Sequence, residues 1–519
     1  MKIKRLMKRL GVCLLVAAVA VTFMAGFVGQ VQAEKPRYGG VLKILRGYSP
    51  RAPGWPSSSA GLELTDLYAC LEPLTKINGN GDPVPFLATS WEYGPDLKSL
   101  ILTIRKGVKF HDGSDLNAET VKMNLEERKS GIYGNEIIII ESVDVIDNHT
   151  VRLNLSEFKN TLLHSFANYN GLMISPKVVE KAKEKKGKKW AKKNPVGTGP
   201  FKFVKFERDV ILKYERFDGY WQKGKPYLDG VETHYVKDQM TQLAALRAGE
   251  AQALWEAPLK DAPKLKKEGF VTISFPGGLR SLASDSDNPE SIYADKRIRE
   301  ALEYAIDRKT ISDGLGYGYW EAINQYSTKK CNSYNPDLIG RPYNPEKAKQ
   351  LLKEAGYPNG FKTSIIAYPV TDGRDVMAAI QQDLKKVGID AAILFYDQGK
   401  YRFAQLKGWK NGLLIFGQNL SINFTHDLRS MFKVGASRFP KTFRPPELRE
   451  VLNKAVAVPD SNDQKTLSQK GVRMISDMAV VTPLWANADI YVTHKSVHDP
   501  GFNGGRRGQW APAGCWLSE

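Results

Sequence analysis

The sequence predicts an α/β protein built from several domains. Segments with the two-residue period of strands alternate with segments of helical period through both halves of the chain, which is typical of this class. The chain has 519 residues, a length that predicts about three domains. Hydrophobic residues make up 42% and aromatic residues 10% of it. These fractions are typical of globular proteins, so a disordered, collagen-like or polytopic membrane protein is excluded.

Residues 1–33 have the order of a secretory signal. Residues 1–10 carry five basic side chains and no acidic one, residues 11–28 are apolar or small, and Val31-Gln32-Ala33 offers a small-residue cleavage site. We therefore expect export, cleavage after Ala33 and a mature chain of 486 residues. A retained membrane anchor is the alternative, because 18 apolar residues just span a bilayer.

The formal net charge of +19 raises nucleic acid or a membrane surface as a partner. The signal-like segment holds five of these charges, which leaves +14 on the mature chain. Residues 177–193 then contribute nine lysines and two glutamates. We interpret this segment as a solvated helix anchored by Trp190, and we expect no nucleic-acid partner.

Three cysteines follow the signal-like segment: Cys70, Cys331 and Cys515. Their odd number fits either one disulfide with a free thiol or three buried thiols, and both alternatives stay open. The sequence contains no zinc-ligand spacing, no His-Glu-x-x-His, no Walker loop and no Gly-x-Ser-x-Gly motif. We expect no cofactor, no metal and no catalytic residue.

The first half of the chain predicts mostly strands. Strand periodicity occurs at residues 38–46, 91–93, 100–105, 143–147 and 151–155, the last two forming a hairpin. A helix is predicted over 62–71, ended by Glu72-Pro73. After a turn at 110–114, Asn117 is placed to cap a further helix, because its side chain accepts from amides that lack a partner in the first turn.

The second half alternates between the two kinds of element. The dense glycines and prolines of 194–201 predict a crossing between structural units. Beyond it, strands are predicted at 201–206, 210–214 and 391–395, and helices at 238–248, 295–313, 345–355 and 376–386. Apolar residues keep helical spacing throughout 295–313, so we expect a single amphipathic helix there.

Seven short motifs then point to a known family. They are Gly39-Gly-Val-Leu42 with Leu71-Glu-Pro-Leu74, Leu102-Thr-Ile-Arg-Lys-Gly-Val-Lys-Phe-His-Asp-Gly113 with Asn117-Ala-Glu-Thr-Val121, Pro195-Val-Gly-Thr-Gly-Pro-Phe201, Tyr220-Trp221 with Gly224-Lys-Pro226, Leu246-Arg-Ala-Gly-Glu250, Arg297-Ile-Arg-Glu-Ala-Leu-Glu-Tyr-Ala-Ile-Asp-Arg308, and Tyr343-Asn-Pro-Glu-Lys-Ala-Lys-Gln-Leu-Leu352 with Glu354-Ala-Gly-Tyr357. On these motifs the whole mature chain resembles the family 5 extracytoplasmic solute-binding proteins, the peptide, nickel and oligosaccharide receptors of ABC importers.

The resemblance implies a periplasmic-binding-protein-like fold of the venus-flytrap type (class II, cluster C), whose two lobes close on a ligand. It implies lobe one from residues 34–75, 196–285 and 495–519, an inserted extra domain from 76–195, and lobe two from 286–494. It further implies a periplasmic monomer that delivers its solute to the permease subunits of an ABC importer in the inner membrane. In this family Phe110-His111-Asp112-Gly113 is a turn motif, so His111 is not expected to be catalytic.

A receptor of this kind needs aromatic walls and a few placed polar groups between its lobes. The candidates on loops near the lobe crossings are Trp55, Trp255, Arg280, Tyr319, Trp320, Trp409, Phe416 and Asn419. Because tryptophan often packs in cores, we expect about half of these candidates to be core residues. An arginine such as Arg280 either holds a ligand carboxylate through two hydrogen bonds or belongs to a structural ion pair.

Residues 416–419 depart from the pattern of peptide-binding relatives. Those relatives usually carry Trp-x-x-Asp, whose aspartate pairs with the α-ammonium group of the peptide, whereas this chain has Phe416-Gly-Gln-Asn419. An amide leaves a desolvated ammonium group without a counter-charge, which costs several kcal/mol. A free peptide N-terminus is therefore less favoured, unless Asp427 or Asp285 supplies the charge.

Several ligand classes stay open on these residues. A neutral oligosaccharide suits Asn419 and the aromatic residues, and an anionic solute suits Arg280 and the positive charge. His426 lies near the position of a histidine in nickel-type relatives and is a weak candidate for a nickel chelate. Outside this family, the alternative is an exported hydrolase.

Overall fold

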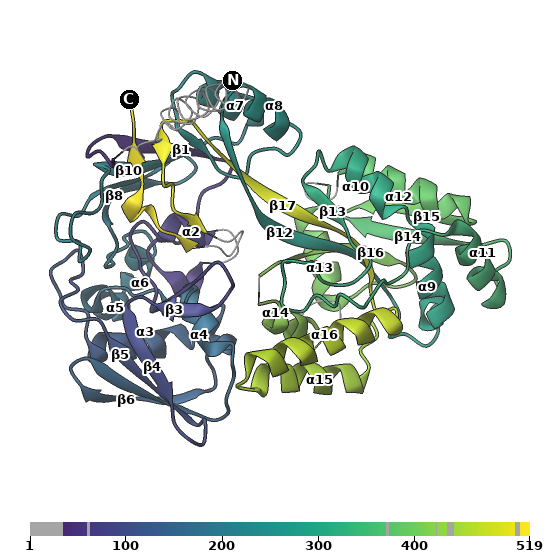
Figure 1. Cartoon of the computed structure of the whole chain (residues 1–519), viewed down its shortest axis with the longest axis horizontal. Coiled ribbons are helices and arrows are strands. Elements are labelled where there is room, and N and C mark those ends of the chain that lie inside the picture. The colour runs from purple at the N-terminus through teal and green to yellow at the C-terminus, as the bar shows by residue number, and fades with distance from the viewer. Residues whose placement is uncertain (1–34, 60–62, 370–372, 422, 433–440, 504–508) are drawn as a thin grey trace, which may run out of the picture. The chain divides into compact units, whose positions relative to one another are not determined.

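An eleven-stranded sheet is the largest element of the structure, which is a computed structural model. Its strands follow the order β15-β14-β16-β12-β17-β11-β1-β10-β9-β8, and β13 pairs with β17 beside this path (Figure 1). The structure describes residues 35–59, 63–369, 373–421, 423–432, 441–503 and 509–519. The predicted signal segment 1–33 lies outside the described residues. Residues 38–519 form one unit.

The strands of this sheet are β1 (Val41–Arg46), β8 (Phe201–Glu207), β9 (Ile211–Arg216), β10 (Gly230–Tyr235), β11 (Ala253–Leu254), β12 (Val271–Ser284), β13 (Trp320–Ala322), β14 (Phe361–Ala367), β15 (Ile389–Phe395), β16 (Leu413–Asn419) and β17 (Thr482–Thr493). We call the half with β1 and β8–β11 lobe one, and the half with β13–β16 lobe two. In lobe one β1 is parallel to β10 and β11, and in lobe two β14 is parallel to β15 and β16.

The predicted strands at 38–46, 201–206, 210–214 and 391–395 are confirmed. Each lobe has its own cores: β1 buries Leu42 and Ile44 in one core of lobe one, and β15 buries Ile389 and Ala391 in one core of lobe two. Alternating apolar positions therefore face these cores, as the two-residue period predicts.

The helices of lobe one are α2 (Leu64–Leu67), α7 (Gln239–Arg247) and α8 (Ala262–Lys267). Those of lobe two are α9 (Lys296–Ala305), α10 (Arg308–Leu315), α11 (Pro345–Glu354), α12 (Arg374–Lys386), α13 (Gln398–Lys407), α14 (Thr425–Phe432), α15 (Pro446–Ala457) and α16 (Ser461–Asp477). The predicted helices at 238–248, 345–355 and 376–386 are confirmed, whereas the one at 62–71 is reduced to the short α2.

The single helix predicted over 295–313 is wrong, because the segment forms α9 and α10. Ile306 adopts an extended conformation between them. The carboxylate of Asp307 then accepts a hydrogen bond from the amide of Thr310 at 3.0 Å, which caps α10. The new cap interrupts the helix although the apolar spacing continues across it.

An inserted domain with a small sheet of its own lies between β1 and β8 in the sequence. Its strands are β4 (Ala88–Tyr93), β5 (Ser99–Ile104), β6 (Ile140–Asp147) and β7 (Thr150–Leu155), in the order β4-β5-β7-β6. α3 (Ala118–Arg128) covers this sheet, and the side chain of Asn117 accepts from the amide of Thr120 at 2.9 Å. The predicted hairpin and helix cap are therefore confirmed.

Shorter elements complete the chain: β2 (Thr75–Ile77), β3 (Pro83–Pro85), α4 (Leu162–Ser165), α5 (Pro176–Lys183), α6 (Gly187–Ala191), β18 (Val497–His498), β19 (Phe502–Asn503), β20 (Gln509–Trp510) and β21 (Trp516–Leu517), with 3-10 turns at Pro56–Ser58, Gly134–Glu136, Tyr169–Gly171, Ile292–Ala294 and Pro512–Gly514.

The lysine-rich segment 177–193 is two helices, α5 and α6, rather than one. Lys186 between them has a left-handed backbone with φ of 69°, which ends a regular helix. Trp190 does not anchor the segment, because its side chain is 37% exposed and is covered on one side by the ammonium group of Lys181. Val178 and Val179 of α5 are the residues that pack into the core of lobe one.

Candidate functional site

Two long strands connect the lobes. β12 and β17 pair antiparallel from Val271↔Thr493 to Leu282↔Thr482 (Figure 1). At one end β17 also pairs with β11 of lobe one, and at the other end β12 pairs with β16 of lobe two. Their register shifts between Pro276 and Gly278, where the sheet passes from one lobe to the other.

The crossing point requires a glycine. A Cβ atom on Gly277 would lie 2.8 Å from Nδ2 of Asn487 and 2.9 Å from Oδ1 of Asp489, both on β17. A side chain at this position would displace the side chains of Asn487 and Asp489. The polar residues Asn487 and Asp489 therefore stand at the crossing itself, where sites between lobes are usually found.

Arg280 and Asn419 lie on the lobe-two side of this crossing. Asn419 is opposite Gly278, and Arg280 is opposite Gly417 on β16 and Trp485 on β17. The guanidinium of Arg280 lies over Gly417, where a Cβ atom would be 1.6 Å from Nη1. Both Arg280 and Asn419 are partly exposed. The glycine in Phe416-Gly-Gln-Asn419 thus makes room for the arginine.

Trp320 in β13 and Tyr319 just before it lie at the same crossing, where Tyr319 packs against a core of lobe one. Trp320 is opposite Asn487 on β17, and its ring stacks on that of Trp485 with centroids 4.8 Å apart. The carbonyl oxygen of Tyr319 accepts from the amide of Ala488 at 3.1 Å. Both side chains are partly exposed. The structure therefore brings four of the eight predicted residues together around β12 and β17: Arg280, Tyr319, Trp320 and Asn419.

The other four candidates are core residues in this structure. Trp55 and Trp255 share a core of lobe one, and Trp409 and Phe416 share a core of lobe two. The indole N–H of Trp409 donates to the carbonyl of Gly412 at 3.0 Å. The ring of Trp255 packs edge-on against Tyr491, Phe502 and Trp510. Their burial follows from their large apolar area, which sequence alone does not assign to core or cleft.

Asp427 and Asp285 could supply the negative charge that position 419 lacks, but both carboxylates are already hydrogen-bonded within the protein. Asp427 is buried, and its oxygens accept from Nε2 of Gln418 at 3.0 Å and from Oγ of Ser421 at 2.9 Å. Asp285 is fully buried and accepts from the amide of Asn411 at 3.1 Å. In this arrangement both carboxylates serve contacts within lobe two.

Sequence reasoning missed an ionic cluster at the carboxyl ends of the parallel strands β1, β10 and β11. Arg46 at the end of β1 is buried and pairs with Asp66 and with the hydroxyl of Tyr48. That hydroxyl donates to Oε1 of Glu256 at 2.8 Å. Burial raises the pKa of Asp66 to about 6, although Arg46 opposes this. Ligands of open α/β sheets bind at such carboxyl edges.

Glu256 and Tyr48 are the members of this cluster that solvent reaches, and the Glu256 side chain is 22% exposed. Glu256 lies two positions after β11, and the next amide, that of Ala257, donates to the carbonyl of Ile490 on β17 at 2.8 Å. Its φ of 59° is uncommon for a residue other than glycine. A strained residue beside the crossing is typical of a functional site. The sequence feature that could have pointed to Glu256 is its position after a strand. That strand, β11, has two residues and is too short to be recognised from sequence.

The inserted domain touches lobe two through Asn160. The amide of Asn160 donates to the carbonyl of Val456 at 3.0 Å, and its Nδ2 donates to the carbonyls of Ala455 and Val458 at 2.8 Å each. Its Oδ1 accepts from Nε2 of Gln464 at 2.7 Å. One side chain therefore joins the end of α15 and the start of α16 to the inserted domain. We call this set of hydrogen bonds the Asn160 contact.

His426 lies at the same contact between the inserted domain and lobe two. Its Nε2 atom on α14 lies 3.8 Å from Oε1 of Glu136 in the inserted domain. Among the described residues, no group of three or more His, Cys, Asp or Glu side chains is placed to hold a metal ion.

Three comparisons with known proteins agree with this architecture. The model of the bacterial extracellular solute-binding proteins, family 5 (middle region), matches residues 82–434. The curated glutathione-binding protein GsiB of Salmonella choleraesuis is 32% identical over 334 residues, which is 62% of each chain. This chain thus matches less than two thirds of the length of that relative.

Solved structures share the fold over nearly the whole chain. The ABC transporter substrate-binding protein CtaP of Listeria monocytogenes superposes with a TM-score of 0.82 at 22% identity, covering 93% of this chain and 100% of that one. The periplasmic binding protein DppA of Helicobacter pylori, in complex with the peptide STSA, gives a TM-score of 0.77 at 23% identity, covering 93% and 99%. The predicted two-lobed α/β fold is confirmed by these likenesses.

Proposed function

The chain belongs to the bacterial extracellular solute-binding proteins, family 5, and on that premise we propose that it captures a small solute between its lobes for an ABC importer. The observation that carries this proposal is the β12–β17 crossing, where partly exposed polar and aromatic side chains from lobe two meet the strands that join the lobes. The signal-like residues 1–33 support a location outside the cytoplasmic membrane. We expect a monomer that docks on permease subunits.

We further propose that the solute is a short peptide or peptide-like anion. The similar curated protein binds glutathione and a solved neighbour holds a peptide. Arg280 supplies two parallel donors that match a carboxylate, which lysine does not. The formal charge of +14 on the mature chain favours the approach of anions.

In this proposal Glu256 takes the role of the aspartate that peptide-binding relatives carry at the position of Asn419. Its partly exposed carboxylate accepts from the Tyr48 hydroxyl and lies 3.5 Å from Nη2 of Arg46. The amide of the next residue, Ala257, donates to the carbonyl of Ile490, which is opposite Ser274 on β12. Ser274 and Arg280 are six positions apart on the strand, which corresponds to about 20 Å. A solute with an ammonium group at Glu256 and a carboxylate at Arg280 is therefore at most about six extended residues long.

The Asn160 contact supports a closed state of the two lobes. It consists of hydrogen bonds that satisfy the amide N–H, Nδ2 and Oδ1 of Asn160 and the nearby carbonyls. Each such hydrogen bond contributes only about 0.5–1.5 kcal/mol. We propose that closure on a solute forms the contact and that release of the solute breaks it.

A ligand panel tests the function. The mature chain is assayed by thermal shift and calorimetry with glutathione, tripeptides, N-acetylated tripeptides, oligosaccharides and nickel–histidine complexes. We expect saturable binding of the free tripeptides or glutathione, with stabilisation of about 2.7 kcal/mol at 100 times the dissociation constant. Binding only of oligosaccharides or nickel complexes would contradict the ligand class. Turnover of a substrate without saturable binding would contradict the receptor function.

A further inference from the structure

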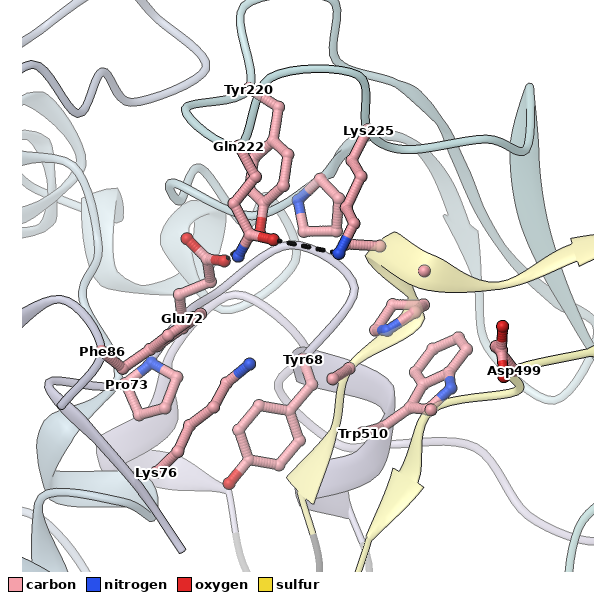
Figure 2. Close-up of a pocket in the computed structure, with 16 residues that line it drawn as sticks. Tyr68, Glu72, Pro73, Lys76, Phe86, Tyr220, Gln222, Lys225, Asp499 and Trp510 are labelled. Carbon is pink, nitrogen blue, oxygen red and sulfur yellow. Dashed lines mark hydrogen bonds between the residues drawn. The ribbon is translucent and has the colours of Figure 1, made fainter. Parts of the chain in front are cut away.

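A separate cavity of about 290 Å³ lies among residues of lobe one and the start of the inserted segment. Its lining comes from residues 68–86, 200–225 and 499–514, and includes nothing from β12, β17 or lobe two. Figure 2 shows Lys76, Lys225, Phe86 and Trp510 around it. A water molecule occupies about 30 Å³ of liquid, so the cavity holds a ligand of roughly ten non-hydrogen atoms.

Two ammonium groups border this cavity. Nζ of Lys76 lies 3.6 Å from the centre of the Phe86 ring, on its face. Nζ of Lys225 has a long contact of 3.5 Å with Oε1 of Gln222. Among the described residues, no carboxylate oxygen lies within the 4 Å of an ion pair from either nitrogen. Two cations therefore face one small space without a direct counter-ion.

The nearest buried acid is already engaged. The carboxylate of Glu72 accepts from the hydroxyl of Tyr220 at 2.7 Å, the indole N–H of Trp221 at 2.9 Å and the hydroxyl of Thr198 at 2.9 Å. Burial lowers the pKa of Lys76; Glu72 opposes this and Lys225 adds to it. The other acid at the cavity, Asp499, is exposed, so solvent screens its charge.

Apolar side chains form part of the cavity wall, beside the polar side chains of Tyr68, Tyr220 and Gln222. Trp510 is buried, and its indole N–H is satisfied by the carbonyl of Pro500 at 2.8 Å, so its ring offers an apolar wall. Pro73 and Pro512 line the cavity as well. A ligand with a negatively charged end and a flat apolar body is therefore complementary to this cavity.

We propose that this cavity is a second ligand site, which binds a small organic anion, a carboxylate or a phosphate monoester, through Lys76 and Lys225. The anion takes the place between the two ammonium groups, and its apolar part packs on Trp510. The proposal is independent of the solute that the lobes capture, because the two sites share no lining residue.

Calorimetry on the mature chain tests this site with benzoate, phenyl phosphate and inorganic phosphate at constant ionic strength. We expect saturable binding of at least one organic probe, weakened at least tenfold in Lys76→Gln and in Lys225→Gln. Lys223→Gln is the matched control, since Lys223 is an exposed residue of the same loop that does not line the cavity. Its affinity should stay within twofold of the wild type. Equal weakening in all three variants, or binding of none of the probes, overturns the proposal.

A second measurement uses the wild-type chain, so its result does not depend on whether a variant folds. Acetylation of lysines in the wild-type chain is followed by mass spectrometry with and without the probe. We expect the bound probe to protect Lys76 and Lys225 at least fivefold, while Lys223 reacts as before. Unchanged acetylation of Lys76 and Lys225 at a saturating probe concentration also overturns the proposal. If inorganic phosphate binds as tightly as phenyl phosphate, the apolar wall does not contribute to binding.

Discussion

Gln464 of lobe two donates a hydrogen bond from its Nε2 to Oδ1 of Asn160 in the inserted domain, at 2.7 Å and across 304 positions of sequence. The same Asn160 side chain donates to the carbonyls of Ala455 and Val458. A short polar side chain therefore joins two parts of the molecule whose cores are separate. Because such bonds exchange readily with water, the contact is suited to form and break with each solute.

Replacing Asn160 should weaken solute binding without harming the fold. Asn160→Ala removes three side-chain hydrogen bonds from the closed state, and a net loss of about 1.4 kcal/mol corresponds to a tenfold higher dissociation constant. Asn154→Ala is the control, because Asn154 bonds only within the inserted domain, to Ser142 and Asp144. Calorimetry with the solute measures both; equal affinities for the two variants would argue against a closing role.

The charge at residue 419 should decide how the carboxylate end of the solute is received. Asn419→Asp places a carboxylate near Arg280, since Asn419 is opposite Gly278 on β12, two positions from Arg280. We therefore expect peptides with a free C-terminal carboxylate to bind about tenfold more weakly relative to their amidated forms. Asn359→Asp, in an exposed turn of lobe two, is the control for net charge. If the ratio between free and amidated peptides stays the same in both variants, residue 419 does not face the solute.

Glu256 should decide how the ammonium end of the solute is received. Glu256→Gln keeps an acceptor for the Tyr48 hydroxyl but removes the negative charge. We expect free peptides to bind about tenfold more weakly while acetylated peptides change little, because only the former carry an ammonium group. The control is Glu250→Gln, at an exposed residue of the same lobe. A loss of affinity that is the same for both kinds of peptide would show a structural role only.

The turn motif at residues 110–113 should set part of the acid sensitivity of the fold. His111 Nε2 lies 2.9 Å from the carbonyl oxygen of Gly199, and its ring packs edge-on against Phe217. Burial lowers the pKa of His111 to about 4 from its usual 6.5. The neutral ring therefore contributes stability that is fully present above about pH 6.5 and is lost as the pH falls through about 4.

Denaturant unfolding between pH 7 and pH 4 measures that contribution. We expect the wild type to lose up to about 3 kcal/mol more than His111→Gln over this range, since one pKa unit corresponds to about 1.4 kcal/mol. His234→Gln, at a partly exposed histidine, should follow the wild-type dependence. A wild-type slope that His111→Gln leaves unchanged contradicts the buried neutral histidine.

The three cysteines should behave as thiols. Cys70, Cys331 and Cys515 are free and buried, and burial raises the pKa of the Cys515 thiol to about 12. We expect the unfolding temperature to be independent of reductant and the denatured mature chain to titrate three thiols. A titration of one thiol would instead reveal the disulfide that the sequence left open.

The sequence predicted the strands and caps well because their signals are local. Alternating apolar residues and a capping Asn117 act within a few positions, and the structure confirms both. The break between α9 and α10 was missed, since Asp307 competes with an apolar period that continues through it. Local cues of similar strength conflict there, and packing decides between them.

Only part of the predicted set of residues meets in the structure, for a physical reason. Arg280, Tyr319, Trp320 and Asn419 meet at β12 and β17, but burial separates them from Trp55, Trp255, Trp409 and Phe416. All eight residues have the chemistry of a binding site. Glu256 and Asn160 have no motif at all, and their roles depend on residues hundreds of positions away.

Small-angle X-ray scattering of the mature chain with and without a saturating solute tests capture between the lobes most directly. We expect a smaller radius of gyration on binding, with Asn160→Ala needing more solute to reach the same compaction. A radius of gyration that stays constant while calorimetry shows the site to be saturated would contradict closure around the solute.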